Sequence, residues 1–418
     1  MKLSLSIYLM MYSLWLIPAS AADEPLLGSN LTGLLDYARE HNPEFAATRY
    51  EADAAQQRVQ PAAALPDPVL RTELFDVTNQ GTNNGWLSQE GTRYTLMQTV
   101  PWFGRRDLQR EVAEAQVAQT DGQVTATWAE LSSKIKSVYA QYYYLSGSER
   151  LTRETLDLMT GLEQVAQTRY ANGLGAQQDV IRTQVEQTGL SSELLDLENE
   201  QHHAQARLNS LLSRPAMTVL AQPVSLRRLP APAQLDYAVL EQKLRARNPQ
   251  LLIADARIAS AEKSRDLAYT NRYPGFTLGV APTQSGSSIK TWDLMVEFSI
   301  PLQQGSRRSQ EHEAESMLAA SGARKEALLN QMLADLSESM SGLETARRTE
   351  WLIATRLLPQ TELTYQSALT GYENGKVDFA TLLDAQRQIL KARQQQLKAQ
   401  LGAQLRLAEI ERLLGEEL

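Results

Sequence analysis

Two short segments in the second half of the chain alternate apolar and polar residues. The apolar positions are Phe276, Leu278 and Val280 in one segment and Trp292, Leu294, Val296, Phe298 and Ile300 in the other. A period of two is that of a β-strand with one apolar and one polar face. The first half repeats the pattern less regularly, at Leu70 and Leu74 and then at Tyr94, Leu96 and Val100. The sequence therefore predicts four short strands, joined in pairs by Gly-, Asn- and Ser-rich loops at 79–91 and 283–288.

Long helical tracts follow each pair of strands. They run from Asp107 to about Tyr170 and from Ser309 to about Tyr372, and each turns at an Asn-Gly pair and returns as a second helix, at 177–212 and 379–414. Shorter helices precede the strands and end near residues 58 and 267. In the first return helix, positions three and four apart form a seam: Val180, Thr183, Gln187, Leu190, Leu194, Leu197, Gln201, Ala204, Leu208 and Leu211. That spacing predicts coiled-coil packing, and its polar members suit a wall around water.

The second half of the chain repeats short phrases of the first in the same order, about 200 residues later. The repeated phrases are Leu34...Asn42-Pro43 and Leu240...Asn248-Pro249, Val100-Pro101 and Ile300-Pro301, Tyr170-Ala171-Asn172-Gly173 and Tyr372-Glu373-Asn374-Gly375, and Leu211-Leu212 and Leu413-Leu414. We therefore expect two structural repeats of one plan, at 22–214 and 234–418. The proline-rich segment 215–233 is the expected linker between them.

The N-terminus has the pattern of a secretory signal peptide at 1–21. Lys2 is followed by an apolar stretch from Leu3 to Ile17, and the small residues up to Ala21 form a cleavage site. A signal anchor is the alternative, although the stretch is short for a spanning helix. No later window approaches ~18 consecutive apolar residues, so we expect any membrane span of the mature chain to be β. The sequence contains no cysteine, which excludes an N-terminal lipidated Cys, disulfides and thiol chemistry.

Composition argues against several classes of function. Among 418 residues, 49 acidic outnumber 41 basic side chains, so no overall basic charge attracts nucleic acid. No phosphate loop, Ser/His/Asp arrangement or paired-carboxylate motif is recognisable, and we expect neither an enzyme nor a cofactor. The four histidines, His41, His202, His203 and His312, form no His-x-x-x-His pair, so we expect no specific metal site.

Four amphipathic strands by themselves leave the hydrogen-bonding groups of their edge strands without partners in lipid. A closed barrel needs at least ~8 strands, so closure requires further copies of the chain. Two copies would supply ~8 strands with little lumen, whereas three would supply ~12 and a water-filled pore. Helices of 35 to 60 residues, at ~1.5 Å per residue, would project roughly 50 to 90 Å from the membrane. The alternative of a different class is a periplasmic coiled-coil scaffold or adaptor that spans no membrane.

The chain resembles the TolC family of outer-membrane efflux proteins over almost all of its mature length. The phrases that carry the resemblance are the repeated Asn-Pro, Pro66-Asp67-Pro68, the strand exit at 100–106 and the two Asn-Gly tips. The resemblance implies an α+β membrane protein of the Gram-negative outer membrane: a homotrimer with a shared 12-stranded β-barrel and a long α-helical periplasmic tunnel. The implied partners are outer-membrane lipid, a periplasmic adaptor (membrane fusion protein) and an inner-membrane pump of the RND type.

The compact length and the strand-exit phrase most resemble channel subunits of heavy-metal exporters, of the cobalt-zinc-cadmium or copper-silver type. Drug efflux and type I secretion are alternatives, because ducts for these cargoes use the same parts. The implied role is passive: substrate passes from the pump and adaptor to the exterior, and selectivity lies in the pump.

The resemblance also implies roles for residues at the two helical tips. The adaptor would dock at Asn172, Gly173, Leu174, Asn374, Gly375 and Lys376. For a closed aperture, Tyr372 would hydrogen-bond to Asp179, and Asp384 would form a three-fold carboxylate ring that favours cations. Thr381 stands where another ring Asp is often found, and Val377 stands where a gate Arg is often found, so the gate is expected to be looser or differently held. The alternative is that these are turn, helix-capping and solvated residues.

Arg105, Arg106, Arg307 and Arg308 follow the strands at the expected membrane boundary. They are candidates for contact with anionic lipid headgroups, and equally for ordinary turn and helix-start residues. Pro101 and Pro301 are expected to redirect each strand into its helix.

Overall fold

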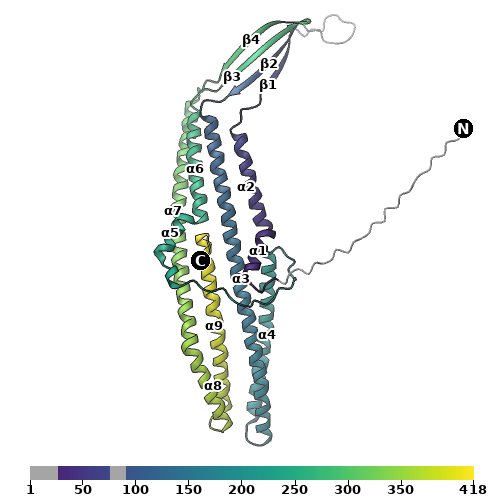
Figure 1. Cartoon of the computed structure of the whole chain (residues 1–418), viewed down its shortest axis with the longest axis vertical. Coiled ribbons are helices and arrows are strands. Elements are labelled where there is room, and N and C mark those ends of the chain that lie inside the picture. The colour runs from purple at the N-terminus through teal and green to yellow at the C-terminus, as the bar shows by residue number, and fades with distance from the viewer. Residues whose placement is uncertain (1–26, 76–90) are drawn as a thin grey trace, which may run out of the picture.

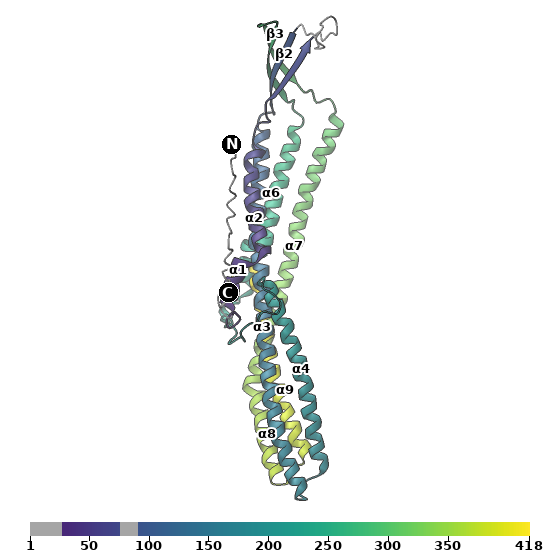
Figure 2. The same ribbon diagram turned by 90° about the vertical axis from the view of Figure 1, so that its right-hand side faces the viewer.

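The computed structural model describes residues 27–75 and 91–418. The expected signal peptide at 1–21 and most of the expected loop at 79–91 lie outside the described residues. The described chain is long and narrow, with a small sheet at one end and two helical hairpins at the other (Figure 1). The view turned by 90° shows the same elongated outline (Figure 2).

The two halves of the chain have the same order of elements. The first contains α1 (Leu31–His41), α2 (Pro43–Ala62), β1 (Val69–Phe75), β2 (Gly91–Val100), α3 (Arg105–Ala171) and α4 (Gln177–Leu211). The second contains a 3-10 turn (Pro232–Gln234), α5 (Tyr237–Arg247), α6 (Pro249–Thr270), β3 (Phe276–Ser285), β4 (Ser288–Phe298), α7 (Gln304–Leu352), a π-helical turn (Ile353–Leu357), α8 (Leu358–Glu373) and α9 (Phe379–Leu414). The strands and return helices lie where the alternation and the seam predicted them.

The single helix expected before each strand pair is instead two helices, and the Asn-Pro phrase marks the break. Asn42 has an extended backbone, and its Oδ1 accepts a hydrogen bond from the Phe45 amide at 3.0 Å, which caps α2. Its Nδ2 donates to the carbonyl of Leu211 at 2.8 Å, at the end of α4. Asn248 repeats both contacts in the second half, with Leu251 at 2.9 Å and Leu413 at 2.7 Å. The repeated phrase therefore joins the start of one helix to the end of another in each half.

Two further expectations required correction. The long helical tract expected from Ser309 to about Tyr372 contains a π-helical turn between α7 and α8, which ends at Leu357, two residues before Pro359. Proline has no amide hydrogen and its ring clashes with the preceding turn, which a wider turn accommodates. The loop expected at 283–288 shrinks to a tight turn between β3 and β4, in which Gly286 has a φ of 65°. Glycine adopts this left-handed conformation without strain.

The four strands form one antiparallel sheet in the order β1-β2-β3-β4. The register aligns Leu70, Leu96, Val280 and Leu294 in one row across all four strands. This face is apolar and open to solvent in the single chain: Leu294 is 87% exposed and Leu70 is 65% exposed. In the described chain, β1 and β4 each have a strand neighbour on one side only.

The opposite face of the sheet contains Met97 and Met295 at its centre, and beside them a chain of polar contacts around Arg93 that joins all four strands. This arginine lies 3.9 Å from Glu73 on β1 and 3.7 Å from Asp293 on β4, and its Nε donates to Thr283 on β3 at 3.3 Å. The sheet therefore presents two faces of different polarity, as the period of two predicted.

One helix, α3, runs the length of the helical region and organises it. Near the sheet it contacts α2 and α6, and towards the other end it contacts α4 and α9 (Figure 1). A hydrophobic cluster around Ile135, Tyr139 and Leu208 fixes the first half, and another around Leu244, Leu336 and Ile410 fixes the second. Among the described residues, no helix combines the length and apolarity needed to cross a membrane.

A buried ionic network ties the two halves together at mid-length. Lys136 on α3 lies 2.9 Å from Glu411 on α9, and both side chains are only 4% exposed. Arg227 of the linker donates from Nη1 to the two Glu411 oxygens at 2.8 and 2.6 Å. Glu417 at the C-terminus is a second partner of Lys136 at 2.8 Å. Buried charges are tolerated when they are paired in this way, so the network fixes how the linker and C-terminus lie against α3.

Candidate functional site

The two hairpin tips share one backbone geometry. At the first tip the Leu174 amide donates to the Arg169 carbonyl at 2.8 Å and the Gly173 amide donates to the Tyr170 carbonyl at 3.0 Å. At the second, Lys376 and Gly375 make the equivalent bonds to Gly371 and Tyr372, at 2.8 and 3.0 Å. This pair of bonds is a Schellman motif, which ends a helix through a residue with positive φ. Gly173 and Gly375 supply that residue, with φ of 72° and 68°.

All six residues expected to dock an adaptor are exposed at these tips. Asn172 and Asn374 turn their side-chain amides back to carbonyls of their own helices, Thr168 and Thr370, both at 2.8 Å. Leu174 is 69% exposed although it is apolar. The tips therefore offer a rigid backbone with one unpartnered apolar side chain at its end.

The two hairpins of the chain are joined near the tips by Arg169 and Tyr372. The Arg169 guanidinium lies 4.8 Å from the centre of the Tyr372 ring, and its Nη1 donates to the Tyr372 carbonyl at 3.2 Å. The ring also packs against Phe379 in a hydrophobic cluster that contains Met159 and Leu382. A cation above a ring and a charged donor to a carbonyl both hold the first hairpin against the second.

The expected hydrogen bond between Tyr372 and Asp179 is not formed. The Tyr372 hydroxyl oxygen is buried and has no partner among the described residues. Burial raises the pKa of this hydroxyl; Arg169 opposes the shift and the negative charge of Asp179 adds to it. Asp179 lies in the first turn of α4, near enough to act on Tyr372 by charge but not by a bond. Arg169, which the sequence analysis missed, makes the inter-hairpin contact instead.

Asp384 lies further up α9 and has an arginine beside it. Arg387 is 3.5 Å from Asp384 and makes a closer pair with Glu186 of α4, from Nε to Oε1 at 3.0 Å. The hydrogen bond with Glu186 raises the pKa of Arg387. The Asp384 carboxylate is 67% exposed and borders an open cavity of about 710 Å³ between α4 and α9, which Ile181 and Arg182 also line.

Thr381 is bound within its own helix. Asp378 caps α9 by accepting from the Thr381 amide at 2.9 Å and from its hydroxyl at 2.5 Å. These two hydrogen bonds lower the pKa of Asp378. Because the folded-state pKa is depressed, the stability from this cap is present at neutral pH and is lost as the pH falls through the lowered pKa. The four expected gate residues thus divide: Tyr372 and Asp179 are neighbours, whereas Thr381 and Asp384 lie on α9 with other partners.

Replacing Arg169 by Gln should loosen the two tips, whereas Tyr372→Phe should not. The first change removes a cation above the ring and charged hydrogen bonds, together about 2 kcal/mol of inter-hairpin interaction. The second removes only a hydroxyl without a partner. Because the sequence contains no cysteine, spin labels can be placed at Leu174→Cys and Lys376→Cys, and the distance distribution between them should broaden in Arg169→Gln alone. If the distance distribution also broadened in Tyr372→Phe, the Tyr372 hydroxyl would contribute to the contact between the hairpins, and this interpretation would be wrong.

The described residues contain no group of three or more His, Cys, Asp or Glu side chains that could hold a metal ion. The helical end combines exposed tips, exposed carboxylates such as Asp384, and arginines that are paired with other residues. Such an arrangement can bind another protein at the tips and can influence the passage of ions.

Comparison with known proteins gives a consistent match over both halves. The sequence profile of the family described as "Outer membrane efflux protein" matches residues 34–214 and 240–416. The cobalt-zinc-cadmium resistance protein CzcC of Cupriavidus metallidurans is 24% identical over 397 residues, which cover 92% of this chain and 90% of CzcC. The pyoverdine export outer membrane protein OpmQ of Pseudomonas aeruginosa is 24% identical over 331 residues, which cover 75% of this chain and 66% of OpmQ.

The fold is also that of solved structures. A crystal structure of CusC, described in terms of folding and transmembrane channel formation, superposes with a TM-score of 0.81 at 18% identity. The superposition covers 92% of each chain. At this level of identity the likeness concerns the fold.

Proposed function

This chain belongs to the family of outer membrane efflux proteins, and from that premise we propose that it is the exit duct of a tripartite exporter. In this role it stands in the outer membrane of a Gram-negative cell and reaches into the periplasm. Three copies share a 12-stranded β-barrel, and their helices form a tunnel that passes substrate from an adaptor and an inner-membrane pump to the exterior.

The observation that carries the proposal is the sheet. Its apolar row of Leu70, Leu96, Val280 and Leu294 is open to solvent in the single chain, while charged and hydroxyl side chains lie on the opposite face beside Met97 and Met295. A soluble scaffold would bury such a row, but lipid is the solvent in which it is stable. The reversed polarity of the other face suits a water-filled lumen.

The free edges support assembly with further copies. Both β1 and β4 lack a neighbour on one side in the described chain, and an open edge is not tolerated in lipid. Because the chain has an even number of strands in the described sheet, β4 of one copy can meet β1 of the next while every pairing remains antiparallel. The lateral helices are unpartnered too: Val185 and Leu195 on α4 are 66% and 68% exposed, and Leu363 on α8 is 71% exposed.

Cross-linking of engineered cysteines tests the shared barrel. In the variant Thr72→Cys/Trp292→Cys, which places one thiol on each edge strand, a bismaleimide should link chains into a ladder that stops at three. The reagent is long enough to link the two thiols whatever the register between β4 of one copy and β1 of the next. The products are resolved by denaturing electrophoresis after reaction in isolated outer membranes.

The matched control places both thiols on the central strands. Thr99 and Thr277 lie within one chain with their hydroxyl oxygens 3.2 Å apart, so Thr99→Cys/Thr277→Cys should give only monomers. If the edge variant were recovered as a soluble monomer, the proposed barrel would be wrong, and the periplasmic scaffold would be the remaining alternative.

We assign the six tip residues to the adaptor, because they are exposed at the end furthest from the sheet and their backbone is fixed by the Schellman bonds. For the cargo we favour heavy-metal cations, since CzcC is a cobalt-zinc-cadmium resistance protein and matches along nearly its whole length. Siderophore or drug export is the alternative, since OpmQ exports pyoverdine. An RND-type pump as partner follows from the resemblance to metal exporters.

We further propose that Asp384 forms the carboxylate ring at the tunnel aperture. Its exposure and its place beside the cavity between α4 and α9 support this role, and Arg387 offsets part of its charge. In planar bilayers, Asp384→Ala should lower cation selectivity and weaken block by divalent ions, whereas Arg387→Ala should raise cation selectivity. Unchanged selectivity and divalent block in Asp384→Ala would exclude the residue from the aperture.

A further inference from the structure

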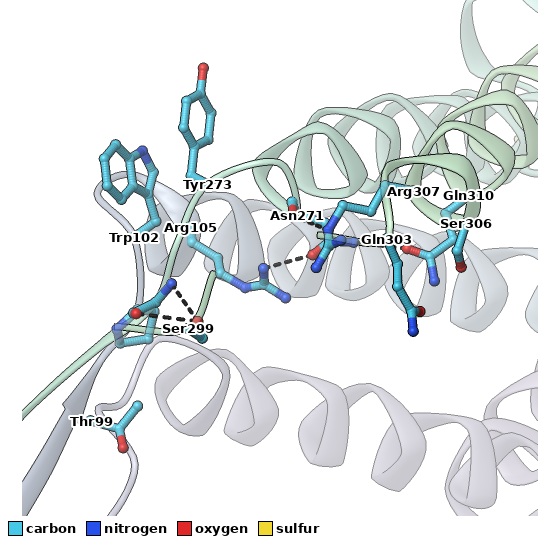
Figure 3. Close-up of a pocket in the computed structure, with 12 residues that line it drawn as sticks. Thr99, Trp102, Arg105, Asn271, Tyr273, Ser299, Gln303, Ser306, Arg307 and Gln310 are labelled. Atoms are coloured by element: carbon cyan, nitrogen blue, oxygen red, sulfur yellow. Dashed lines mark hydrogen bonds between the residues drawn. The ribbon is translucent and has the colours of Figure 1, made fainter. Parts of the chain in front are cut away.

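A cavity at the junction of sheet and helices contains two arginines and no acidic side chain. It has a volume of about 520 Å³ and lies where β2 passes into α3 and β4 passes into α7 (Figure 3). Arg105 and Arg307 line it together with hydroxyl and amide side chains, including Ser299, Ser306 and Gln310. The cavity therefore has a positive charge that its own walls do not neutralise.

Both arginines are held in place by one residue. Arg105 donates from Nη1 to the side-chain oxygen of Asn271 at 2.7 Å, and Arg307 donates from Nε to the Asn271 carbonyl at 2.7 Å. Figure 3 shows the two guanidinium groups approaching Asn271 from different helices. Such bonds fix the direction of a guanidinium and leave its remaining N–H groups to bind something else.

One of these arginine nitrogens makes no hydrogen bond in the described chain. The Nη1 of Arg307 is enclosed and has no hydrogen-bond partner among the described residues. A charged donor that is shielded from water is costly unless a partner satisfies it. Trp102 and Tyr273 also line the cavity and stack with centroids 4.9 Å apart and planes 5° apart, which gives the cavity a flat aromatic wall.

The neighbouring arginines are placed differently. Arg106 donates from Nε to the Ala63 carbonyl at 2.7 Å, and neither it nor Arg308 lines the cavity. The four arginines that follow the strands therefore form two groups. One member of each Arg-Arg pair faces the cavity, and the other provides a matched control.

We propose that this cavity is a binding site for a phosphate oxyanion, carried by an anionic phospholipid headgroup or by free phosphate. Two guanidinium groups with no competing carboxylate match the charge and the acceptor geometry of phosphate. The aromatic wall suits the glycerol region of a lipid, since such rings combine an apolar face with a polar edge. The lipid source rests on the proposed membrane position of the sheet, whereas the binding of an oxyanion does not.

Detergent-purified protein allows the two sources to be separated. Native mass spectrometry measures adducts with phosphatidylglycerol against phosphatidylcholine, and calorimetry measures affinity for inorganic phosphate. The variant Arg105→Gln/Arg307→Gln should weaken the bound species about tenfold or more, since each lost bond is to a charged group. The control Arg106→Gln/Arg308→Gln removes the same charge and should bind as the wild type does.

A second variant leaves the Asn271 contacts intact, in case loss of both arginines unfolds the junction. Ser306→Glu introduces a carboxylate into the cavity on the first turn of α7, where a negative charge does not harm a helix. It should abolish binding by repulsion. Ser309→Glu places the same charge outside the cavity lining and should have no effect.

Selective adducts with phosphatidylglycerol that both cavity variants lose support the lipid as the ligand. Binding of inorganic phosphate alone, lost in the same variants, supports the oxyanion site with free phosphate as the ligand. Absence of both in the wild type, or equal binding in Ser306→Glu and Ser309→Glu, overturns the proposal. None of these outcomes depends on trimer formation or conductance, so failure here is distinguishable from failure of the proposed duct.

Discussion

Leu294→Arg should abolish insertion of the protein into the outer membrane. Leu294 lies at the middle of β4, is 87% exposed, and belongs to the apolar row that crosses the whole sheet. An arginine facing lipid near the bilayer midplane costs about 2–4 kcal/mol in each chain. In a barrel shared by three copies, this cost would occur three times at the same depth in the membrane. The measurement is the amount of heat-resistant trimer in the outer-membrane fraction after density-gradient separation, which should fall to background.

Glu297→Arg is the matched control for this experiment. The residue lies three positions further along β4, on the opposite, polar face, where it pairs with Thr277 of β3. Because that face is expected to meet water, the same arginine should be tolerated and trimers should form in normal amounts. If Leu294→Arg also assembled normally, the apolar face would not be in lipid, and the proposed duct would lose its main support.

Glu411→Gln should produce the largest loss of stability in the helical region. The substitution leaves Lys136 and Arg227 without their shared carboxylate, and Lys136 is only 4% exposed. Among the described residues, Lys136 then keeps one carboxylate partner, Glu417, whose side chain is 73% exposed. Because removing a buried partner of a buried charge leaves that charge poorly compensated, the loss should reach about 3–5 kcal/mol. Urea unfolding of the detergent-solubilised protein, followed by helical circular dichroism, measures the change.

The order of effects among related variants identifies the cause. Lys136→Met should cost less than Glu411→Gln, because Glu411 keeps its bonds to Arg227. Glu409→Gln is the control on the same helix; its pair with Arg412 is partly exposed, and we expect a loss below about 1 kcal/mol. A loss for Glu411→Gln as small as that of Glu409→Gln would mean that water or rearrangement compensates the network.

Acid should weaken the same region. The hydrogen bond from Lys136 lowers the pKa of Glu417, so this carboxylate contributes stability above its unfolded-state pKa. That contribution is lost as the pH falls through the lowered pKa.

The regular parts of the fold were predictable because their patterns are local. Alternation at Trp292 to Phe298 and the seam from Val180 to Leu211 follow directly from the geometry of strands and helices. The break at Asn42 was less visible, since Asn-Pro is compatible with a turn or a helix start. Its second contact, to Leu211, depends on an element far along the chain and has no local signal.

The candidate site was predictable in its positions but not in its contacts. The glycines of the tips follow from the Asn-Gly turns, and the cap by Asp378 could have been recognised because an Asp directly precedes the first apolar residue of the helix. The pairs Arg169 with Tyr372 and Arg387 with Glu186 join residues about 200 positions apart. Only packing of one hairpin against the other determines such pairs, and the family pattern assigned Tyr372 to a different partner.

The contacts between the hairpins join nearly equivalent positions of the two repeats, as with Glu186 and Arg387 or Glu193 and Gln394. Each half also caps its own second helix and supplies two neighbouring strands. Such a plan is what gene duplication and fusion leave behind. If the two halves arose by duplication of one unit, joining them in one chain allows each copy to change separately, so that one tip carries Leu174 and the other Lys376.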